Sequence, residues 1–185
     1  MINRIVLPLI LVSFSFLLTN CSNSPSTQEK PIRDYLSLDT TMFPFRMQYP
    51  AESKIVLRKN EPEALWFDIV YPARKSTIYC TYFPVRGNFR TYDEDVRRFV
   101  YRHTVVATAI KEQAFSLPEK KLYALIFDIK GEVASPVQFL ITDSVSHFLR
   151  GALYYDNTAY SDSLALSTAD IREDIIHLIQ TLEWR

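Results

Sequence analysis

The chain has 185 residues, 21 basic and 21 acidic side chains and a formal net charge of zero, a balance that indicates neither a nucleic-acid-binding protein nor a polybasic membrane arm. It contains three glycines, too few for a glycine-rich phosphate loop or a dinucleotide-binding turn. Its eleven tyrosines and twelve phenylalanines favour a sheet-rich domain with one globular core.

Residues 1–20 have the pattern of a lipoprotein signal peptide. Arg4 supplies a positive charge, and residues 5–18 supply an apolar run that is shorter than the about twenty residues of a membrane-spanning helix. The run leads into LTNC at 18–21, which resembles a bacterial lipobox: an aliphatic residue, two small or polar residues and a cysteine. We therefore predict that Cys21 is lipidated and that the leader is cleaved before it.

Lipidation of Cys21 would hold the protein at a membrane. A diacylglyceryl group on the thiol and an acyl group such as palmitate on the new N-terminus would bury several chains, and each buried methylene contributes about 0.8 kcal/mol. The alternative is an ordinary leader followed by a chance cysteine. Lipidation leaves Cys80 as the remaining free cysteine, which excludes an intramolecular disulfide. Cys80 shares a strand face with Ile78 and Tyr82, which predicts a small core side chain.

Residues 21–40 are expected to form a lipidated tether, followed by a single globular domain at 41–185. The run SNSPSTQEKP at 22–31 has too little apolar surface to fold by itself. No acidic cluster follows Cys21 directly, so we expect the domain to face the periplasm from its lipid anchor. The sequence leaves open whether the anchor lies in the inner or the outer membrane.

Alternating apolar residues predict an antiparallel meander in the first half of the domain. A strand is expected at 65–71, where Leu65, Phe67 and Ile69 share one face, and a shorter strand is expected at 54–58. Three predicted strands end in an aromatic residue followed by proline, which cannot donate to a ladder and marks a strand end or an edge. These pairs are Tyr49-Pro50, Tyr71-Pro72 and Phe83-Pro84.

A helix is predicted from residue 91. Thr91 and Glu94 match a capping box, in which the threonine side chain caps the helix and the glutamate reaches back to the threonine amide. Apolar residues then recur at helical spacing and predict one stripe that packs on the sheet. The stripe consists of Val96, Phe99, Val100, His103 and Ala107. His103 lies at its margin, where a half-buried, hydrogen-bonded histidine is expected rather than a metal ligand.

Two further elements complete the predicted domain. Residues 122–129, LYALIFDI, are almost continuously apolar, which predicts a central strand covered on both faces. Residues 167–170 form a second capping pattern, and a last helix with one apolar stripe is expected to follow. The stripe consists of Ile171, Ile175, Leu178 and Leu182. The whole order predicts an α+β fold, an antiparallel sheet of about 6–8 strands with two main helices packed on it.

The run QFLITDSVSHFLRGALYYD at 138–156 predicts a hairpin between two apolar strands. With a turn from Asp143 to Ser146, Phe139 lies opposite Arg150, because successive pairs keep one register. Both faces of the hairpin are mostly apolar, so both sides of the sheet should be at least partly covered. Arg150 is expected to stack on Phe139 or to pair with a nearby carboxylate.

Asp143, Ser144 and His147 are the residue types of nucleophilic catalysis. Ser144 does not stand in a Gly-x-Ser-x-Gly elbow, and the turn itself explains Asp143 and Ser144, since both side chains can cap local backbone donors. The sequence therefore favours a binding or assembly module over an enzyme. We predict that Asp143, Ser144, His147 and Arg150 face a partner protein, together with the loop at 156–163.

A metal centre is not expected. A zinc site would have to gather His103, His147, His177 and Cys80 from four distant segments. Zinc ligands usually include a pair at short spacing, and these residues contain none. We therefore predict no metal and no cofactor.

Several segments together resemble the gliding motility lipoprotein GldD family of the Bacteroidota. They include TIYCTY at 77–82, QFLITDSVSHFLRGALYYD at 138–156 and the closing TLEW at 181–184. The resemblance implies a noncatalytic, membrane-anchored periplasmic component that is needed for gliding motility and for the type IX secretion machinery. It also implies partners, namely other Gld lipoproteins and an integral membrane protein such as GldE.

The order of strands and helices is also similar to that of Mog1/PsbP-like domains, in which an antiparallel sheet is sandwiched by helices. A similarity of topology speaks weakly about function. A small-molecule-binding or hydrolytic periplasmic lipoprotein therefore remains the alternative. Neither function involves nucleic acid.

Overall fold

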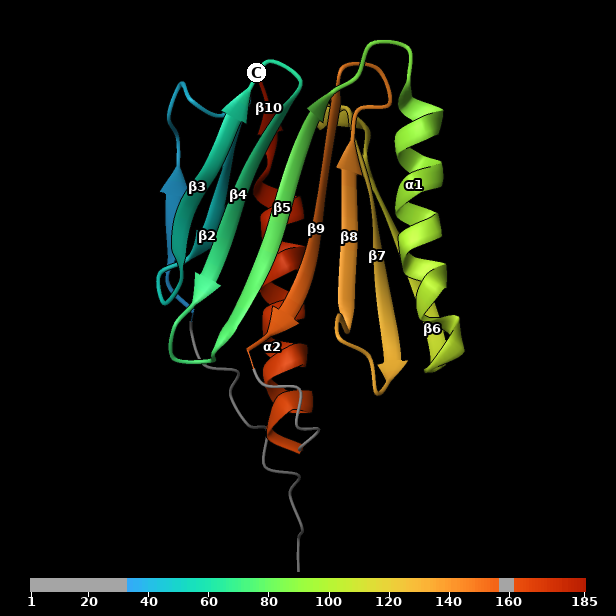
Figure 1. The fold of residues 1–185 in the computed structure, drawn as a ribbon. Helices are drawn as coiled ribbons and strands as arrows, with labels where there is room; N and C mark the ends of the chain where they lie inside the picture. Colours follow the sequence, from blue (N-terminus) through green and yellow to red (C-terminus); the bar gives the residue numbers. More distant parts are fainter. Residues whose placement is uncertain (1–32, 157–161) are drawn as a thin grey trace, which may run out of the picture. The chain divides into compact units, whose positions relative to one another are not determined.

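The computed structural model describes residues 33–156 and 162–185, which form two antiparallel sheets and two α-helices (Figure 1). In these residues the larger sheet has seven strands in the order β3-β4-β5-β9-β8-β7-β6, and the smaller has three in the order β1-β2-β10. The strands are β1 Tyr35–Leu38, β2 Phe45–Pro50, β3 Lys54–Glu61, β4 Ala64–Tyr71, β5 Ser76–Pro84, β6 Ala107–Leu117, β7 Leu122–Gly131, β8 Val137–Thr142, β9 His147–Tyr155 and β10 Glu183–Trp184. The helices are α1 Phe89–Tyr101 and α2 Asp162–Thr181, with 3-10 turns at Arg102–Val105 and Pro118–Lys120. The predicted α+β fold is confirmed.

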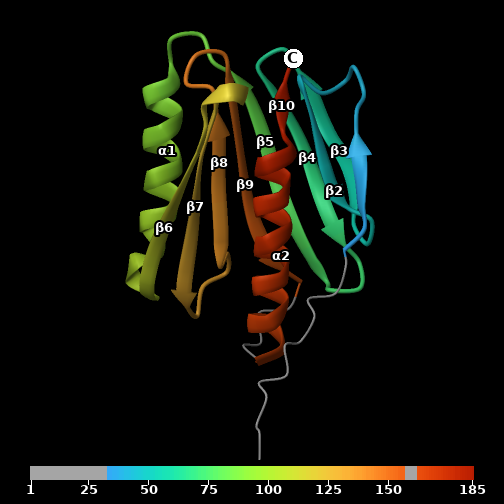
Figure 2. The same cartoon turned by 180° about the vertical axis from the view of Figure 1, so that it is seen from behind.

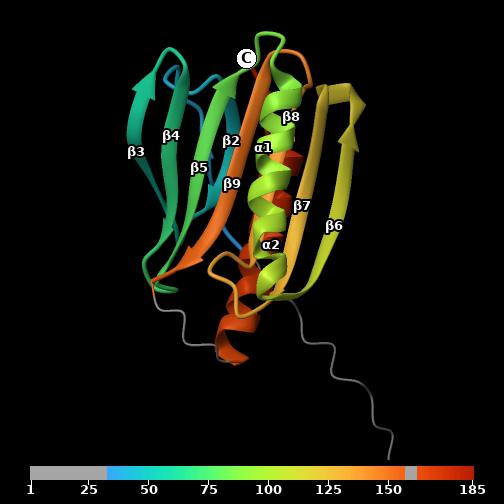
Figure 3. The same cartoon turned by 45° about the vertical axis from the view of Figure 1, so that its right-hand side comes forward.

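The two helices lie on opposite faces of the seven-stranded sheet. Figure 2 shows α2 in front of this sheet beside β2 and β10, whereas Figure 3 shows α1 in front of the other face. Buried side chains accordingly form two groups, one between the sheet, α2 and β2 and a smaller one between the sheet and α1. Every residue of β8 is buried, because this strand is covered on both faces.

The apolar stripe of the last helix is confirmed, since all four predicted residues are buried. The helix begins at Asp162, however, and not after a cap at 167–170. Thr168 Oγ1 donates a hydrogen bond to the Leu164 carbonyl (2.7 Å), which is the bond that a threonine inside a helix makes with the preceding turn. The predicted capping pattern therefore lies within α2.

Helix α1 begins and ends earlier than predicted. It begins at Phe89, so Thr91 lies in its first turn and is not the N-cap. The helix ends at Tyr101, and Ala107 opens β6 instead of continuing the apolar stripe. The stripe residues that are buried against the sheet are Val96 and Val100.

Strand β6 has no counterpart among the predicted strands. It forms an edge of the large sheet, and most of its residues are partly or fully exposed, so the sequence shows no buried alternation there. Its presence moves β7, which was predicted to be central, to the second position from that edge. The middle of β7 is nonetheless covered on both faces as predicted, because Ile126 belongs to the α2-side core and Phe127 to the α1-side core.

The hairpin of β8 and β9 is confirmed, but its register differs by one residue from the prediction. Phe139 lies opposite Gly151 rather than Arg150. The turn is longer because the Asp143 carboxylate accepts the backbone N–H of His147 (2.8 Å) and so holds His147 within it. A one-residue shift changes which side chains share a face, and Arg150 does not share a face with Phe139.

The compact unit begins at Arg33, earlier than the domain start expected at residue 41. Arg33 donates hydrogen bonds to the carboxylates of Asp170 and Asp174 on α2, at 2.5 Å each. The hydroxyls of Tyr35 and Tyr71 also donate to Asp174, at 3.1 and 3.4 Å. These five residues, which we name the Arg33 clasp, fix the start of the domain to the last helix.

Candidate functional site

Asp143 and Ser144 form the turn between β8 and β9. One carboxylate oxygen of Asp143 accepts three consecutive backbone N–H groups. They belong to Val145 (2.9 Å), Ser146 (2.8 Å) and His147 (2.8 Å). Burial raises the pKa of the Asp143 carboxyl, but these donors lower it more, so the pKa lies below its ordinary value. Ser144 has a positive φ of 67°, and its N–H donates to the Thr142 hydroxyl (2.8 Å).

His147 lies on the side of the sheet that α2 covers. Its Nδ1 is 2.9 Å from the Tyr82 hydroxyl, and its ring stacks on Trp184 of β10 with the ring centroids 4.8 Å apart. Burial lowers the pKa of His147, and the Asp143 carboxylate opposes this shift in part. Because Asp143 binds backbone amides and His147 contacts Tyr82, the side chains of Asp143, Ser144 and His147 are not joined in a catalytic relay.

The lowered pKa of His147 predicts that the protein loses stability on mild acidification. The unfolded chain takes up the proton near the ordinary value of 6.5, whereas the folded chain takes it up at a lower pH. The stabilisation by neutral His147 is therefore fully present above about pH 6.5 and decreases as the pH falls below it. We expect the urea midpoint to decrease from pH 7 to pH 5 and His147→Gln to make this decrease smaller.

His177 provides the comparison for this experiment. Its pKa is also lowered, chiefly by burial, and its ring stacks on Tyr35 with the centroids 3.6 Å apart. The His147→Gln variant should therefore keep the part of the pH dependence that comes from His177, and His177→Gln should remove that part. A pH dependence that is unchanged in the His147 variant would contradict the assignment.

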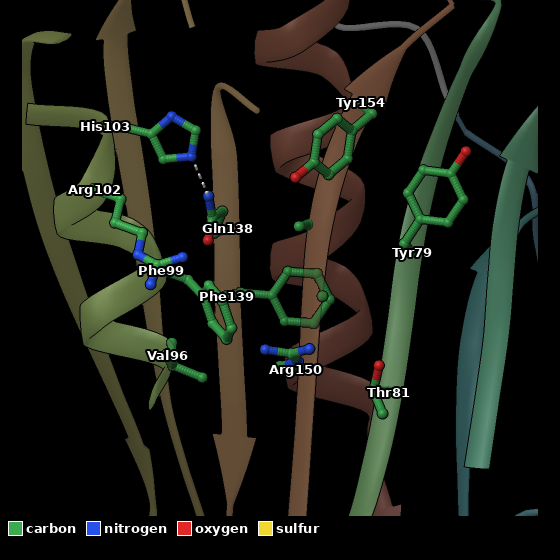
Figure 4. Close-up of a pocket in the computed structure, with 12 residues that line it drawn as sticks. Tyr79, Thr81, Val96, Phe99, Arg102, His103, Gln138, Phe139, Arg150 and Tyr154 are labelled. Atoms are coloured by element: carbon green, nitrogen blue, oxygen red, sulfur yellow. Dashed lines mark hydrogen bonds between the residues drawn. The ribbon is translucent and has the colours of Figure 1, made fainter. Parts of the chain in front are cut away.

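Arg150 lies on the opposite face of β9 from His147, in a cleft between α1 and the large sheet (Figure 4). The cleft has a volume of about 600 Å³ and is lined by side chains from α1, the 3-10 turn after it, β5, β8 and β9. The aromatic and basic side chains of the lining are Tyr79, Phe99, Arg102, His103, Phe139, Arg150 and Tyr154. Of the four residues predicted to face a partner, Arg150 alone lines this cleft.

The Arg150 guanidinium stacks on aromatic rings of the α1 side. Its central carbon lies 5.0 Å from the ring centroid of Phe99 and 6.0 Å from that of Phe83. The expected cation–π contact is therefore present, but with these two rings and not with Phe139. Burial lowers the pKa of Arg150, and Asp95 and Tyr154 oppose this shift in part.

His103 and Cys80 have the environments that the sequence predicts. His103 is half-buried in the 3-10 turn that follows α1, and its Nε2 lies 3.2 Å from the side-chain nitrogen of Gln138. Cys80 is buried in the same core as Ile78 and Tyr82, and burial raises the pKa of its thiol. His103 is therefore hydrogen-bonded beside the sheet, and Cys80 is a core side chain.

Sequence reasoning did not single out Tyr79, Arg102 or Tyr154. The two tyrosines alternate with buried neighbours on β5 and β9, a signal that could have marked them as exposed aromatic residues on one sheet face. Their ring centroids lie 5.6 Å apart. This proximity depends on the pairing of β5 with β9, which are far apart in the chain, so no local pattern indicates it.

Residues 33–156 and 162–185 contain no three His, Cys, Asp or Glu side chains that come together as metal ligands. In the same residues, no helix has both the length and the apolar character needed to cross a membrane. The lipidation site predicted at Cys21 and residues 157–161 of the predicted partner loop lie outside the described residues.

The domain has a PsbP-like fold. The domain is similar to the solution structure of cyanobacterial PsbP (CyanoP) from Synechocystis sp. PCC 6803, with a TM-score of 0.52 and 8% sequence identity, over 86% of this chain and 98% of that chain. This similarity confirms the predicted PsbP-like topology and concerns the fold alone. No curated protein matches the chain.

The family follows from the sequence match. The model of the family described as gliding motility lipoprotein GldD matches residues 25–184. The chain belongs to the gliding motility lipoprotein GldD family, as its late hairpin indicated. Its role is that of a gliding motility lipoprotein, which associates with a membrane.

Proposed function

We propose that the protein is a lipid-anchored accessory or assembly component of the gliding motility and type IX secretion machinery on the periplasmic face of a cell membrane. The observation that carries this proposal is the family match over residues 25–184, together with the lipobox that ends at Cys21. Its proposed partners are other Gld lipoproteins and a GldE-like integral membrane protein.

The proposed role is noncatalytic. The contacts of the hairpin turn support this, because Asp143 is engaged by three backbone amides and His147 by Tyr82 and Trp184. Catalysis by such residues needs the base to reach the nucleophile and an orienting group to reach the base. The proposed partner-facing residues are Asp143, Ser144, His147 and Arg150. They do not share one face of the sheet, because His147 lies on the α2 side and Arg150 in the cleft beside α1.

One observation favours a second candidate, a small-molecule-binding periplasmic lipoprotein. The cleft volume of about 600 Å³ falls within the range of about 300–1,000 Å³ that is usual for ligand pockets. The hydrolytic form of this alternative has no comparable support, since no catalytic relay is formed around His147.

Replacing Cys21 with alanine in the full chain is expected to abolish lipid labelling and to release the protein from membranes, because the thiol is the acyl acceptor. Labelled palmitate incorporation and membrane fractionation would measure this. In a strain that lacks its own copy, the variant is expected to fail to restore type IX secretion, measured by mass spectrometry of cargo proteins in the medium, and gliding where the host glides.

Cys80→Ala is the matched control, because Cys80 is buried in the core and is not a lipidation site. It should keep lipid labelling and membrane association. Labelling retained in Cys21→Ala would refute the lipobox prediction. Normal cargo secretion in the deletion strain would refute the proposed role in type IX secretion.

A further inference from the structure

We propose that the cleft between α1 and the large sheet binds an acidic segment of a partner protein, with a carboxylate of that segment held by Arg150 and Arg102. The proposal rests on the proposed function, since it names how this lipoprotein contacts a partner. Charge, contacts and shape of the cleft support it independently of the family.

Most arginines of the described chain are paired with a carboxylate, but the two arginines of the cleft are not. The described residues contain twelve arginines, and nine of them form an ion pair with a carboxylate. Arg102 and Arg150 are two of the three that do not, and both line the cleft, whose lining contains no Asp or Glu. In a chain with zero net charge, this is a local excess of positive charge.

The contacts of Arg150 leave its donors for a ligand. Its guanidinium lies over Phe99 and Phe83, and within the described part of the chain its side chain forms no ion pair. Burial lowers the pKa of Arg150 and the Asp95 carboxylate raises it in part, but Asp95 is itself paired with Arg98 at 2.5 Å. A half-buried cation without a partner is costly, and a planar carboxylate matches the fork of guanidinium donors in a bidentate way.

Arg102 lies near the same aromatic ring as Arg150. Its guanidinium carbon is 5.7 Å from the centroid of the Phe99 ring, compared with 5.0 Å for Arg150. Both cations therefore lie beside one aromatic ring, and Figure 4 shows Arg102 and Phe99 on the α1 side of the cleft and Arg150 on β9. A carboxylate bound beside Phe99 would be attracted by both arginines.

The shape of the cleft favours an extended chain over a compact ion. The stretch of β9 from Arg150 to Tyr154 lines it, and at about 3.3 Å per residue this stretch is about 13 Å long, enough for about four extended residues. On the other side of the cleft lie Phe99 of α1 and His103 of the 3-10 turn that follows it. Tyr79 and Tyr154 are 50% and 37% exposed and offer apolar contact, as aromatic residues often do at interfaces.

Photocrosslinking in native membranes would identify the segment that occupies the cleft. The full-length, membrane-anchored chain carries p-benzoylphenylalanine in place of Tyr79, and mass spectrometry maps the crosslinked peptide. The matched control carries the same group in place of Tyr123, which is similarly exposed at 43% but does not line the cleft. We expect a segment with Asp or Glu to be crosslinked from position 79 and not from position 123.

A synthetic peptide of the mapped segment then tests the arginines by calorimetric titration. We expect Arg150→Gln and Arg102→Gln each to weaken binding at least tenfold, and replacement of the peptide's acidic residues by their amides to have the same effect. Arg150→Lys should bind with intermediate affinity, because lysine keeps the charge but loses the bidentate geometry. Arg90→Gln is the matched control, since Arg90 is exposed and outside the cleft, and should bind like wild type.

Three results of these experiments would overturn the proposal. These results are no crosslink from position 79, a crosslinked segment without carboxylates, or full affinity in an Arg150→Gln variant that circular dichroism shows to be folded. A cleft variant that restores secretion fully in the deletion strain would refute the cleft as the partner site and leave the proposed function intact. Failure of the deletion strain to show a secretion defect would refute the proposed function itself.

Discussion

Replacing Asp174 with alanine is expected to lower the free energy of unfolding by about 3 kcal/mol. Asp174 is 2% exposed, and its carboxylate accepts hydrogen bonds from Arg33, Tyr35 and Tyr71 in the Arg33 clasp. Its removal leaves the Arg33 cation without its buried partner, and breaking a buried pair in this way costs about 3–5 kcal/mol. We expect the lower end of this range because Arg33 keeps its ion pair with Asp170.

Urea unfolding of the mature, unlipidated chain, followed by circular dichroism, would measure this loss. Asp170→Ala is the matched control, because Asp170 lies one turn earlier on α2 and its side chain is 47% exposed. It pairs with Arg33 and Arg74, and exposed pairs contribute about 0–1 kcal/mol. Equal losses in the two variants would contradict a special role for the buried carboxylate.

Replacing Gly151 with alanine is expected to lower the free energy of unfolding by about 2 kcal/mol, because adding atoms to a well-packed core costs about 1–3 kcal/mol. Gly151 lies opposite Phe139 in the hairpin. A Cβ atom at this position would lie 2.3 Å from Cζ of the Phe139 ring, and the Phe139 side chain is fully buried. The ring therefore has little room to move away.

A double-mutant cycle with Phe139→Leu separates this contact from a general effect on the strand. The leucine side chain is shorter than the ring, so Gly151→Ala should cost much less in the Phe139→Leu background than in the wild type. Thermal unfolding monitored by circular dichroism would give both differences. The same cost in the two backgrounds would show that the Phe139 ring is not the cause.

The sequence predicts best those elements whose packing follows a local pattern. The stripe from Ile171 to Leu182 is regular over three turns, so its burial against the sheet is predictable without the structure. Strand β4 likewise alternates between two covered faces. The family also follows from the sequence, because the run at 138–156 is long and specific.

The predictions that failed depend on side-chain bonds or on position in the sheet. The register of the late hairpin depends on Asp143, whose carboxylate lengthens the turn to include His147. Strand β6 is an edge strand with exposed side chains, which gives no periodic signal of burial. Helix α1 begins at Phe89, although the capping-box pattern at Thr91 and Glu94 predicts a later start.

The candidate cleft could be predicted only in part. Arg150 was singled out from the sequence, together with a cation–π contact, but its aromatic partners were not. Phe99 comes from α1 and Phe83 from β5, and the packing of α1 on the sheet decides which ring meets the guanidinium. The absence of an ion pair to Arg150 among the described residues is a property of the folded chain, since acidic residues are frequent in the sequence.

The Arg33 clasp also limits how far the domain can reach from a membrane. It fixes the chain to α2 at Arg33, so in the proposed anchored form only the residues from Cys21 to Arg33 span the distance to the lipid. Twelve residue steps extend to at most about 43 Å at about 3.6 Å per residue. A partner that is held by this domain is therefore kept near the bilayer, and weakening the clasp would free the chain only as far as β1, which pairs with β2 from Tyr35 onward.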